Sequence, residues 1–409
     1  MLHLVASNLV DVKFEEIVLE EKKFDLNSPE NAFVRAKFRE YYSGQGRHFQ
    51  LPYEFTAREF GVGFEDKIDY RHKSFANENE VRDYLAREAP FYISYSTARY
   101  SLPGARPMEK KGFLGADIAF DLDKPKRQPE HDHSAVMCEF CLEKTRDDAL
   151  LFVEDFLLDD FGLSEKEVQT NFSGSKGYHF HVRTPDVQKL SSIARKELCD
   201  YAAAFGVEAD KVFTEEKFGT RKAEYSLLGP SLESKGWSAK VFKSITSFVE
   251  RADEALCKQE GLSPQKTKLF LEKRGEILQK ISSGRWSALQ GLEEFWKQLA
   301  TQAISIKRVE LDAPVSFDMA RLIRLPGSLH GDTGLLTVTL SKNELSKFEP
   351  LKDAVVFKKG FVQVEGTPFL PAARVVFMGQ EFGIVSSLKT EVPEGLAVML
   401  LRKGKAKLA

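Results

Sequence analysis

The stretch GADIAFDLDKPK, residues 115–126, places two aspartates one residue apart inside an apolar run. Its alternating pattern predicts a β-strand, on which successive side chains point to opposite faces. Apolar side chains fill one face of this strand, and Asp121 and Asp123 share the other. Two carboxylates so close repel each other unless a cation lies between them, so the pair suggests a divalent-cation site. The same spacing also fits a strand end that faces solvent.

A third carboxylate comes much later in the chain, in VELDAPV (309–315). Here Asp312 lies on what we expect to be a second apolar strand, although it could equally be a turn residue before Pro314. Three converging carboxylates are typical of two-metal sites, which stabilise the attacking and leaving oxygens of a phosphoryl transfer. The pattern therefore favours Mg²⁺ or Mn²⁺ as the bound ion.

Residues 168–184 predict two strands around a glycine turn, with FSGSKGYHFHV at its centre. Glycines let the backbone approach a ligand, and hydroxyls, a lysine and exposed N–H groups can bind phosphate oxygens. An ordinary polar hairpin is the alternative, and we expect His181 to be structural. The candidate nucleotide-binding residues of the turn are Ser173, Ser175, Lys176 and His179.

A second basic segment, RLIRLPGSLHG (321–331), surrounds a Pro-Gly turn. Arg324 and His330 are candidate nucleotide-binding residues, because positive groups beside metal-binding carboxylates suit polyphosphate chemistry. Arg321 could instead be a surface residue of an amphipathic helix. We expect the short helix to cover SFDMARLIRL.

The composition is that of a soluble globular chain, with 409 residues, 42% hydrophobic and 29% charged. This length predicts two or three structural units. No apolar run approaches the ~18 residues of a membrane span, and no signal peptide is expected at the N-terminus. The small number of cysteines predicts a reducing, cytoplasmic protein. A net charge of −2 argues mildly against a protein coated in nucleic acid, but a local basic groove remains compatible with it.

The pattern along the chain predicts a mixed α/β core that a helical module interrupts. We expect a helix over Thr145–Asp160 with Thr145 as its N-cap, and a helix that begins at Ser263-Pro264. The expected units are the first part of the core (1–187), a mostly helical subdomain (188–305), the second part of the core (306–345), and a strand-rich C-terminal segment without an assigned role (346–409).

Four cysteines are too few for a disulfide scaffold, and two of them form a C-x-x-C pair. Together with two nearby histidines this pair can close a tetrahedral, structural zinc site within about residues 128–144. A loop with two free cysteines and no metal is the alternative. The candidate ligands are His131, His133, Cys138 and Cys141.

Taken in order, FDLD, HDHSAVMCEFC, FSGSKGYHFHV and LDAP…RLIRLPGSLHG resemble the catalytic small subunit of archaeal and eukaryotic DNA primases. The resemblance covers residues 52–340. It implies a primase-type core with mixed sheets, a helical subdomain and a zinc knuckle that is often richer in cysteine, which leaves open whether His131, His133 or both bind zinc. It implies that Asp121, Asp123 and Asp312 bind the catalytic metals. It also places Arg58, in an Arg-Glu-Phe motif, near the incoming nucleotide.

The resemblance further implies a function in DNA replication. A DNA primase of this kind is a DNA-directed RNA polymerase that makes short RNA primers on a single-stranded DNA template by two-metal nucleotidyl transfer. Its substrates are NTPs, with dNTPs as a further possibility, and its partner is a large primase subunit in a heterodimer. The alternatives are a primase-polymerase or repair polymerase of the same superfamily, a non-catalytic single-strand-binding subunit, and a zinc-dependent interaction module.

Overall fold

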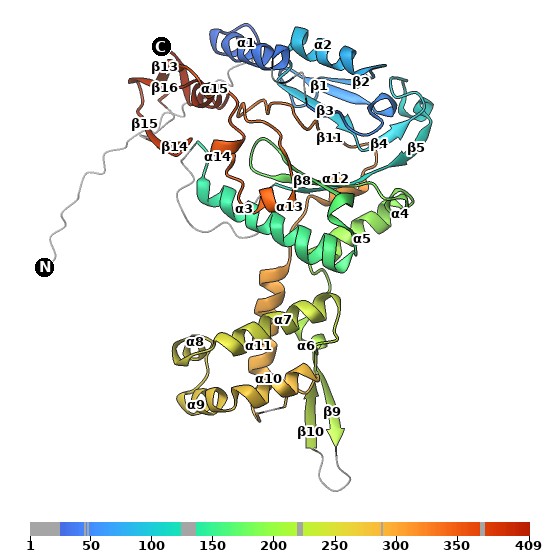
Figure 1. The fold of residues 1–409 in the computed structure, drawn as a ribbon, viewed down its shortest axis with the longest axis vertical. Helices are drawn as coiled ribbons and strands as arrows, with labels where there is room; N and C mark the ends of the chain where they lie inside the picture. Colours follow the sequence, from blue (N-terminus) through green and yellow to red (C-terminus); the bar gives the residue numbers. More distant parts are fainter. Residues whose placement is uncertain are drawn as a thin grey trace, which may run out of the picture.

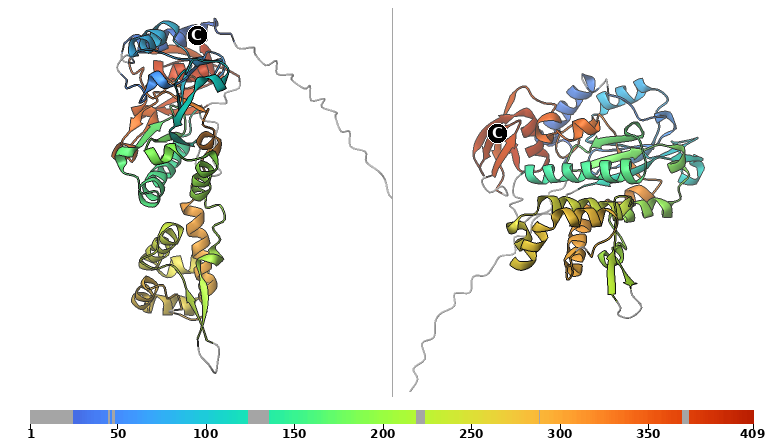
Figure 2. Two further views of the ribbon diagram at one scale, coloured as in Figure 1. Left: turned by 90° about the vertical axis from the view of Figure 1, so that its right-hand side faces the viewer. Right: turned by 60° about the horizontal axis from the view of Figure 1, so that its bottom comes forward.

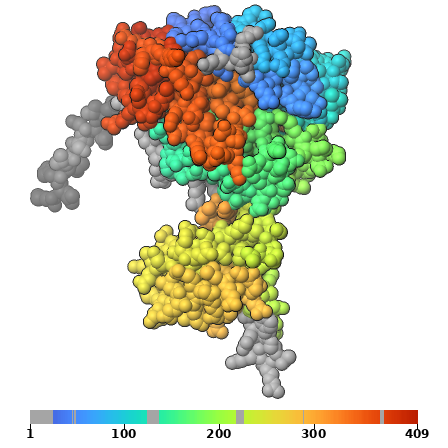
Figure 3. Space-filling model, viewed as in Figure 1, coloured from blue at the N-terminus to red at the C-terminus, as the bar shows by residue number. Residues whose placement is uncertain are grey.

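The computed structural model describes residues 25–44, 46, 49–123, 136–218, 224–287, 289–368 and 373–409. These residues form a broad α/β body from which a narrower, mostly helical module projects (Figures 1 and 2). Figure 3 shows the module, coloured yellow to orange, as a separate lobe below the body. In the described parts of the chain, no helix is long and apolar enough to cross a membrane.

One four-stranded antiparallel sheet carries Asp121. Its strand order is β12-β7-β8-β6, and its strands are β6 (Ile118–Leu122), β7 (Val168–Phe172), β8 (Tyr178–Val182) and β12 (Thr339–Leu340). Asp121 on β6 is paired with His179 on β8, which is paired in turn with Asn171 on β7. The other face of the sheet is apolar, and Phe120 and Phe180 pack against Phe152. The expected strand over 115–123 is divided, because its first residues belong to a separate ribbon, β4 (Ala98–Tyr100) with β5 (Phe113–Ala116).

A second four-stranded sheet, of order β11-β3-β1-β2, lies beside the first. Its strands are β1 (Phe60–Gly63), β2 (Tyr70–Lys73), β3 (Tyr92–Ser96) and β11 (Leu322–Arg324). The helices α1 (Pro29–Ser43) and α2 (Glu78–Glu88) cover its outer face (Figure 1). Buried side chains from both helices, such as Phe38 and Leu85, share one core with Phe60 and Ile93.

The long helix that begins within the C-x-x-C pair starts earlier than expected. It consists of α3 (Glu139–Leu151) and a continuing π-helical segment, η4 (Phe152–Asp160). Cys138 is its N-cap, with a sulfur that accepts from the backbone N–H of Cys141 at 3.4 Å. The expected cap Thr145 lies inside the helix, where its hydroxyl donates to the Cys141 carbonyl at 2.7 Å. The prediction was wrong because the buried Leu142 extends the apolar side of the helix by a turn.

The segment around the third aspartate also differs from its predicted form. We expected Asp312 to lie on a strand within 309–315, but no strand forms there: α11 (Glu293–Lys307) ends shortly before this segment, and α12 (Ala313–Phe317) begins within it. Asp312 is the residue before α12, and its backbone N–H donates to the Asp121 carbonyl at 2.8 Å. Pro314 near the first position of a helix favours this turn. The expected helix over 316–325 is likewise replaced by the end of α12 and strand β11.

The projecting module consists of helices with one hairpin. Ser263 caps α9 with Pro264 at its first position, as predicted. Trp286, Trp296 and Phe270 form an aromatic cluster in its core. Its elements are the hairpin β9 (Thr214–Phe218) and β10 (Glu224–Leu228), with α6 (Ala209–Val212), α7 (Gly236–Arg251), α8 (Glu254–Gln259), α9 (Pro264–Glu272), α10 (Arg274–Ser282) and α11.

The remaining elements belong to the body. The helix α5 (Ser192–Ala202) contacts α12 of the body, and its Tyr201 carbonyl also accepts from Nε1 of Trp237 in the module at 2.9 Å. The predicted limit at residue 188 stays a prediction. The helix α15 (Glu394–Arg402) packs on α1, and Arg402 donates to the Gly331 carbonyl at 2.7 Å. The C-terminal strands are β13 (Phe361–Gly366), β14 (Ala373–Phe377), β15 (Gln380–Ile384), β16 (Lys389–Pro393) and β17 (Ala406–Leu408). Short helical turns are η2 (Phe55–Ala57), η3 (Met108–Lys111), η5 (Glu165–Glu167), α4 (Pro185–Gln188), α13 (Lys342–Leu345) and α14 (Pro350–Asp353).

Candidate active site

A pocket of about 650 Å³ opens where the two four-stranded sheets meet. Both sheets, the glycine turn and the start of α12 contribute to its wall. It brings together nearly all of the predicted site residues, although they come from distant parts of the chain. Those that line it are Asp121, Asp123, Ser173, Ser175, Lys176, His179, Asp312, Arg324 and His330.

Three carboxylates converge on one side of this pocket. Asp121, Asp123 and Asp312 each offer an oxygen, and these oxygens all lie within 4.8 Å of one another. The pKa of Asp121 is raised well above its usual value, because the group is buried and because Asp123 and Asp312 repel its charge. A divalent cation would relieve that repulsion, and an all-oxygen ligand set suits Mg²⁺ or Mn²⁺. The residues present therefore fit a divalent metal.

The glycine turn lies close to these carboxylates. A side chain at Gly177 would place its Cβ 2.3 Å from the Leu122 carbonyl oxygen and 2.8 Å from the Cα of Asp123. Gly174 has a φ of +80°, and a Cβ there would lie 2.8 Å from the Cβ of His330. The Ser173 hydroxyl accepts from the backbone N–H of Gly177 at 3.2 Å and so closes the turn. Both glycines are needed because the backbone passes so near to the other site residues.

Two histidines contribute neutral imidazoles to the pocket. The Nε2 atom of His179 lies 3.6 Å from Oδ1 of Asp121. Burial, together with the nearby Arg324 and Lys67, lowers the pKa of His179 to about 3. Burial also lowers the pKa of His330 well below its usual value. The Nδ1 atom of His330 accepts from the backbone N–H of Asp332 at 3.2 Å, so the proton of the neutral ring lies on Nε2.

Arg324 supplies a fixed positive charge. It lies on β11, with its guanidinium carbon 5.5 Å from the centre of the Tyr92 ring. Its Nη1 is buried and has no hydrogen-bond partner among the described residues. A buried guanidinium donor that faces a pocket is suited to an anionic oxygen.

Sequence reasoning missed two further basic residues of the pocket wall, Lys67 and Arg71. Both lie in the β1–β2 region, where no motif marks them. Arg71 is held by Glu59, with Nε 2.9 Å from Oε1. These residues reach the pocket only because this region folds against β11 and α12. They could therefore be found from the three-dimensional structure but not from a local sequence pattern.

Arg58 does not line the pocket. It is completely buried, and it donates to the carbonyls of Tyr53, Ser96 and Thr97 and to the Asp117 carboxylate at 2.8 Å. The structure therefore places this residue inside the protein, where it connects β1 with β3. The predicted contact with a nucleotide is not supported by this position, because these partners already engage its guanidinium.

The zinc prediction concerns residues that are only partly described. His131 and His133 lie outside the described residues, and Cys138 and Cys141 lie at the start of α3. The zinc knuckle consequently stays a prediction.

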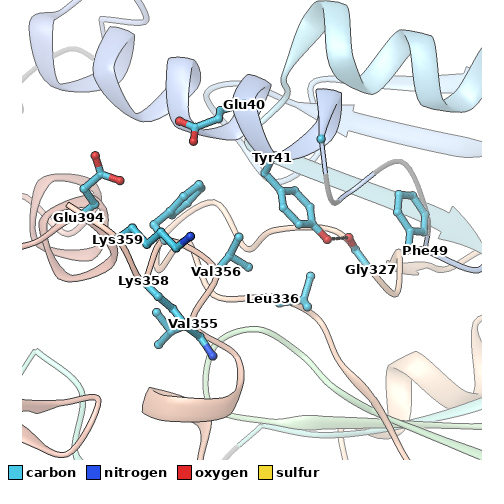
Figure 4. Close-up of a pocket in the computed structure, with 12 residues that line it drawn as sticks. Glu40, Tyr41, Phe49, Gly327, Leu336, Val355, Val356, Lys358, Lys359 and Glu394 are labelled. Carbon is cyan, nitrogen blue, oxygen red and sulfur yellow. Dashed lines mark hydrogen bonds between the residues drawn. The ribbon is translucent and has the colours of Figure 1, made fainter.

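A second cavity, of about 780 Å³, lies between α1 and residues 355–359. The Tyr41 hydroxyl donates to the Gly327 carbonyl at 2.9 Å on its wall (Figure 4). None of the predicted site residues lines this cavity.

Convergent carboxylates opposite cationic and imidazole donors define the class of site that handles metal-bound phosphates. The family model of the DNA primase small subunit matches residues 120–341, and the chain belongs to that family. This range contains every pocket-lining residue predicted from the sequence.

Curated relatives agree along almost the whole chain. A DNA primase small subunit PriS from Methanothrix thermoacetophila is 35% identical over 402 residues, which cover 94% of this chain and 100% of the relative. The protein of the same name from Methanococcoides burtonii is 32% identical over 91% of this chain and 97% of its own length. The one from Haloarcula marismortui is 32% identical over 82% and 87%. The resemblance found in the sequence is thereby confirmed.

Proposed function

We propose that this chain is the catalytic subunit of a DNA primase that makes short RNA primers on single-stranded DNA during replication. The observation that carries the proposal is the convergence of Asp121, Asp123 and Asp312 within 4.8 Å on the wall of a pocket that lysine and arginine side chains also line. Membership of the primase small-subunit family supports the same conclusion.

Asp121, Asp123 and Asp312 would hold Mg²⁺ or Mn²⁺. When bound, such ions lower the pKa of an attacking 3′-hydroxyl and balance charge on the departing pyrophosphate. The chain itself needs no nucleophile for this reaction. The carboxylates would fix the position of the reacting groups.

The basic side of the pocket would bind the triphosphate of an NTP. Lys176 and Arg324 offer charged donors, while Ser173 and Ser175 lie in a turn with close backbone access. His179 and His330 are neutral near pH 7 because burial lowers the pKa of each ring. Neutral imidazoles can donate to phosphate oxygens without adding to the charge already supplied by the lysine and the arginine.

The expected partners are a large primase subunit, a single-stranded DNA template and NTPs, with dNTPs as possible substrates. A structural zinc ion bound by Cys138, Cys141 and one or both of His131 and His133 belongs to the same proposal, as does a cytoplasmic location. The zinc is tested by metal analysis of the purified protein and of a Cys138→Ser, Cys141→Ser variant. Wild-type protein without zinc would exclude the knuckle.

The function is tested by incubating the protein with single-stranded DNA, NTPs and Mg²⁺ or Mn²⁺. We expect products of a few to tens of nucleotides, and a loss of about 10²–10³-fold or more in an Asp121→Asn, Asp123→Asn variant. Asp186→Asn is the matched control, because the Asp186 side chain is 96% exposed on α4. Unchanged synthesis in the double variant would contradict the metal assignment. Long products from dNTPs on a primed template would favour a primase-polymerase instead.

A further inference from the structure

A helix of the C-terminal segment, α15, packs against the turn that carries His330. The Arg402 guanidinium at the end of this helix donates from Nε to the Gly331 carbonyl at 2.7 Å. A Cβ at Gly334 would lie 2.5 Å from Cγ1 of Val398 on α15, so the helix and the turn are in close contact. Because His330 lines the pocket, the end of α15 has a fixed position beside the candidate active site.

The chain leaves α15 through a defined cap. The backbone N–H of Lys405 donates to the Leu400 carbonyl at 2.9 Å, and the N–H of Gly404 donates to the Leu401 carbonyl at 3.1 Å. With Gly404 at a φ of +63°, these two bonds form a Schellman motif. The chain then continues into β17, which pairs with β13. Lys403, the residue between the helix and this turn, is therefore held in place by its backbone.

Lys403 is a partly buried cation in an unfavourable electrostatic setting. Burial and the charge of Lys176 lower its pKa, and the charge of Lys405 acts in the same direction. The negative end of a helix dipole favours a lysine at this place, so desolvation and repulsion outweigh the dipole. Asp332 opposes the shift, but its carboxylate already accepts a hydrogen bond from the Tyr92 hydroxyl.

The lysines near this end of the pocket lack a counter-charge. Lys176 lines the pocket, and the charge of Lys403 contributes to the lowered pKa of His330, which lines it as well. Neither Lys176 nor Lys403 forms an ion pair within the described parts of the chain. A bound anion relieves repulsion among cations, just as a cation relieves repulsion among carboxylates. Phosphate oxygens suit lysine, which acts on them as a compact point charge.

We propose that Lys403 is a nucleotide-binding residue that contacts the terminal phosphate of a bound triphosphate together with Lys176. This inference rests on the proposed function, because in a two-metal transfer the α-phosphate lies at the metals and the γ-phosphate lies farthest from them. Lys403 does not line the pocket itself, but its long side chain starts next to Lys176 and His330, which do. The C-terminal segment (346–409) thereby completes the phosphate side of a site whose other residues all precede residue 341.

Calorimetric binding of ATP and of ADP to the full chain with Mg²⁺ tests this contact without requiring catalysis. Lys403→Met should weaken the binding of ATP by about 10-fold, the effect of one charge-assisted hydrogen bond, and that of ADP by less than about 2-fold. Lys403→Arg keeps the charge and should retain most of the affinity for ATP. Lys407→Ala is the matched control, because it removes one positive charge from an exposed residue of the same segment.

The possible outcomes separate this contact from its alternatives. An unchanged affinity for ATP in folded Lys403→Met would overturn the contact, and equal losses for ATP and ADP would overturn its assignment to the terminal phosphate. Weaker binding of a single-stranded oligonucleotide, with unchanged binding of ATP, would assign the lysine to the DNA backbone instead. A wild-type protein that binds ATP but makes no primers would overturn the proposed function and leave the contact in place.

Thermal unfolding gives an independent measurement with inorganic triphosphate as the probe. Without any ligand, Lys403→Met should have a Tm equal to or above that of the wild type, because the substitution removes a desolvated and repelled charge. Added triphosphate should then raise the Tm of the wild type more than that of the variant. Equal increases in both proteins would contradict an anion site at Lys403.

Discussion

Asp121 is the carboxylate whose pKa the site raises well above its usual value. Its pKa is raised by burial first and then by the charges of Asp123 and Asp312. An acid whose pKa is higher in the folded state than in the unfolded state binds more protons when folded, so the fold loses stability as the pH rises above the unfolded pKa. The arrangement of carboxylates that would bind a cation therefore lowers the stability of the metal-free protein.

Asp121→Asn should therefore stabilise the metal-free protein by about 1 kcal/mol, because it removes the repulsion while it abolishes primer synthesis. Thermal unfolding in EDTA measures this difference. Added Mg²⁺ should raise the Tm of the wild type but not that of the variant, since only the wild type keeps the full ligand set. A variant less stable than the wild type in EDTA would contradict this account.

The buried histidines predict an opposite dependence on pH. The pKa of His179 is lowered to about 3, and the pKa of His181 and of His330 is lowered as well. A base with a lowered pKa binds fewer protons in the folded state, so stability should fall as the pH drops below about 6.5. Each histidine contributes up to about 1.4 kcal/mol per pH unit. We therefore expect the free energy of unfolding, measured with urea, to fall less steeply between pH 7 and pH 5 in His181→Asn than in the wild type. An equal dependence of stability on pH in both proteins would argue against a buried neutral His181.

At the scale of elements, the glycine turn and the end of β6 are packed backbone to backbone. Gly177→Ala should displace Asp123, because the new Cβ would lie 2.8 Å from the Asp123 Cα. We expect a loss of primer synthesis of at least about 10²-fold, since small displacements in a reacting geometry have large effects. Gly383→Ala is the matched control, because no atom lies within 4 Å of a Cβ at that position. Activity of Gly177→Ala equal to that of the control would show that the close approach is not needed.

The sequence was sufficient to predict the elements with strong periodicity. The alternation of Ile118, Phe120 and Leu122 predicts β6 and the shared side of the acidic pair. It was insufficient around Asp312, because the apparent alternation there is overridden by Pro314 and by the hydrogen bond from Asp312 to the end of β6. That contact joins residues far apart in the chain.

The same distinction holds for the site. The turn residues Ser173 and Lys176 could be predicted because glycines and polar groups lie together in the sequence. Lys67 reaches the pocket only through the packing of the second sheet. Arg58 was placed by family resemblance alone, and its burial beside Asp117 was not accessible from local pattern.

At the scale of the whole molecule, one buried ion pair connects the body to the helical module. Lys240 on α7 contacts Asp160 at the end of η4, with the Nζ–Oδ2 distance at 2.6 Å and both side chains nearly fully buried. The same Nζ donates to the Asp155 carbonyl at 2.8 Å. Trp237 packs against Phe156 beside this pair. The contact between the body and the module thus includes an ion pair that is buried away from water.

Lys240→Ala should lower the free energy of unfolding by about 3 kcal/mol, because it leaves Asp160 buried without its cation. Lys243→Ala is the matched control on the same helix. Lys243 contacts Asp159 at 3.2 Å in an exposed pair, so its loss should cost less than about 1 kcal/mol. Urea unfolding of both variants measures the difference, and equal costs would contradict the structural role of the junction.

The central claim is that Asp121, Asp123 and Asp312 together bind the divalent ion of a primase. Anomalous diffraction from crystals of the protein soaked with Mn²⁺ and an NTP tests it most directly. We predict a manganese peak bound by oxygens of these three carboxylates, with the triphosphate on the side of Lys176 and Arg324. Ordered nucleotide with no manganese at the three carboxylates would contradict the account.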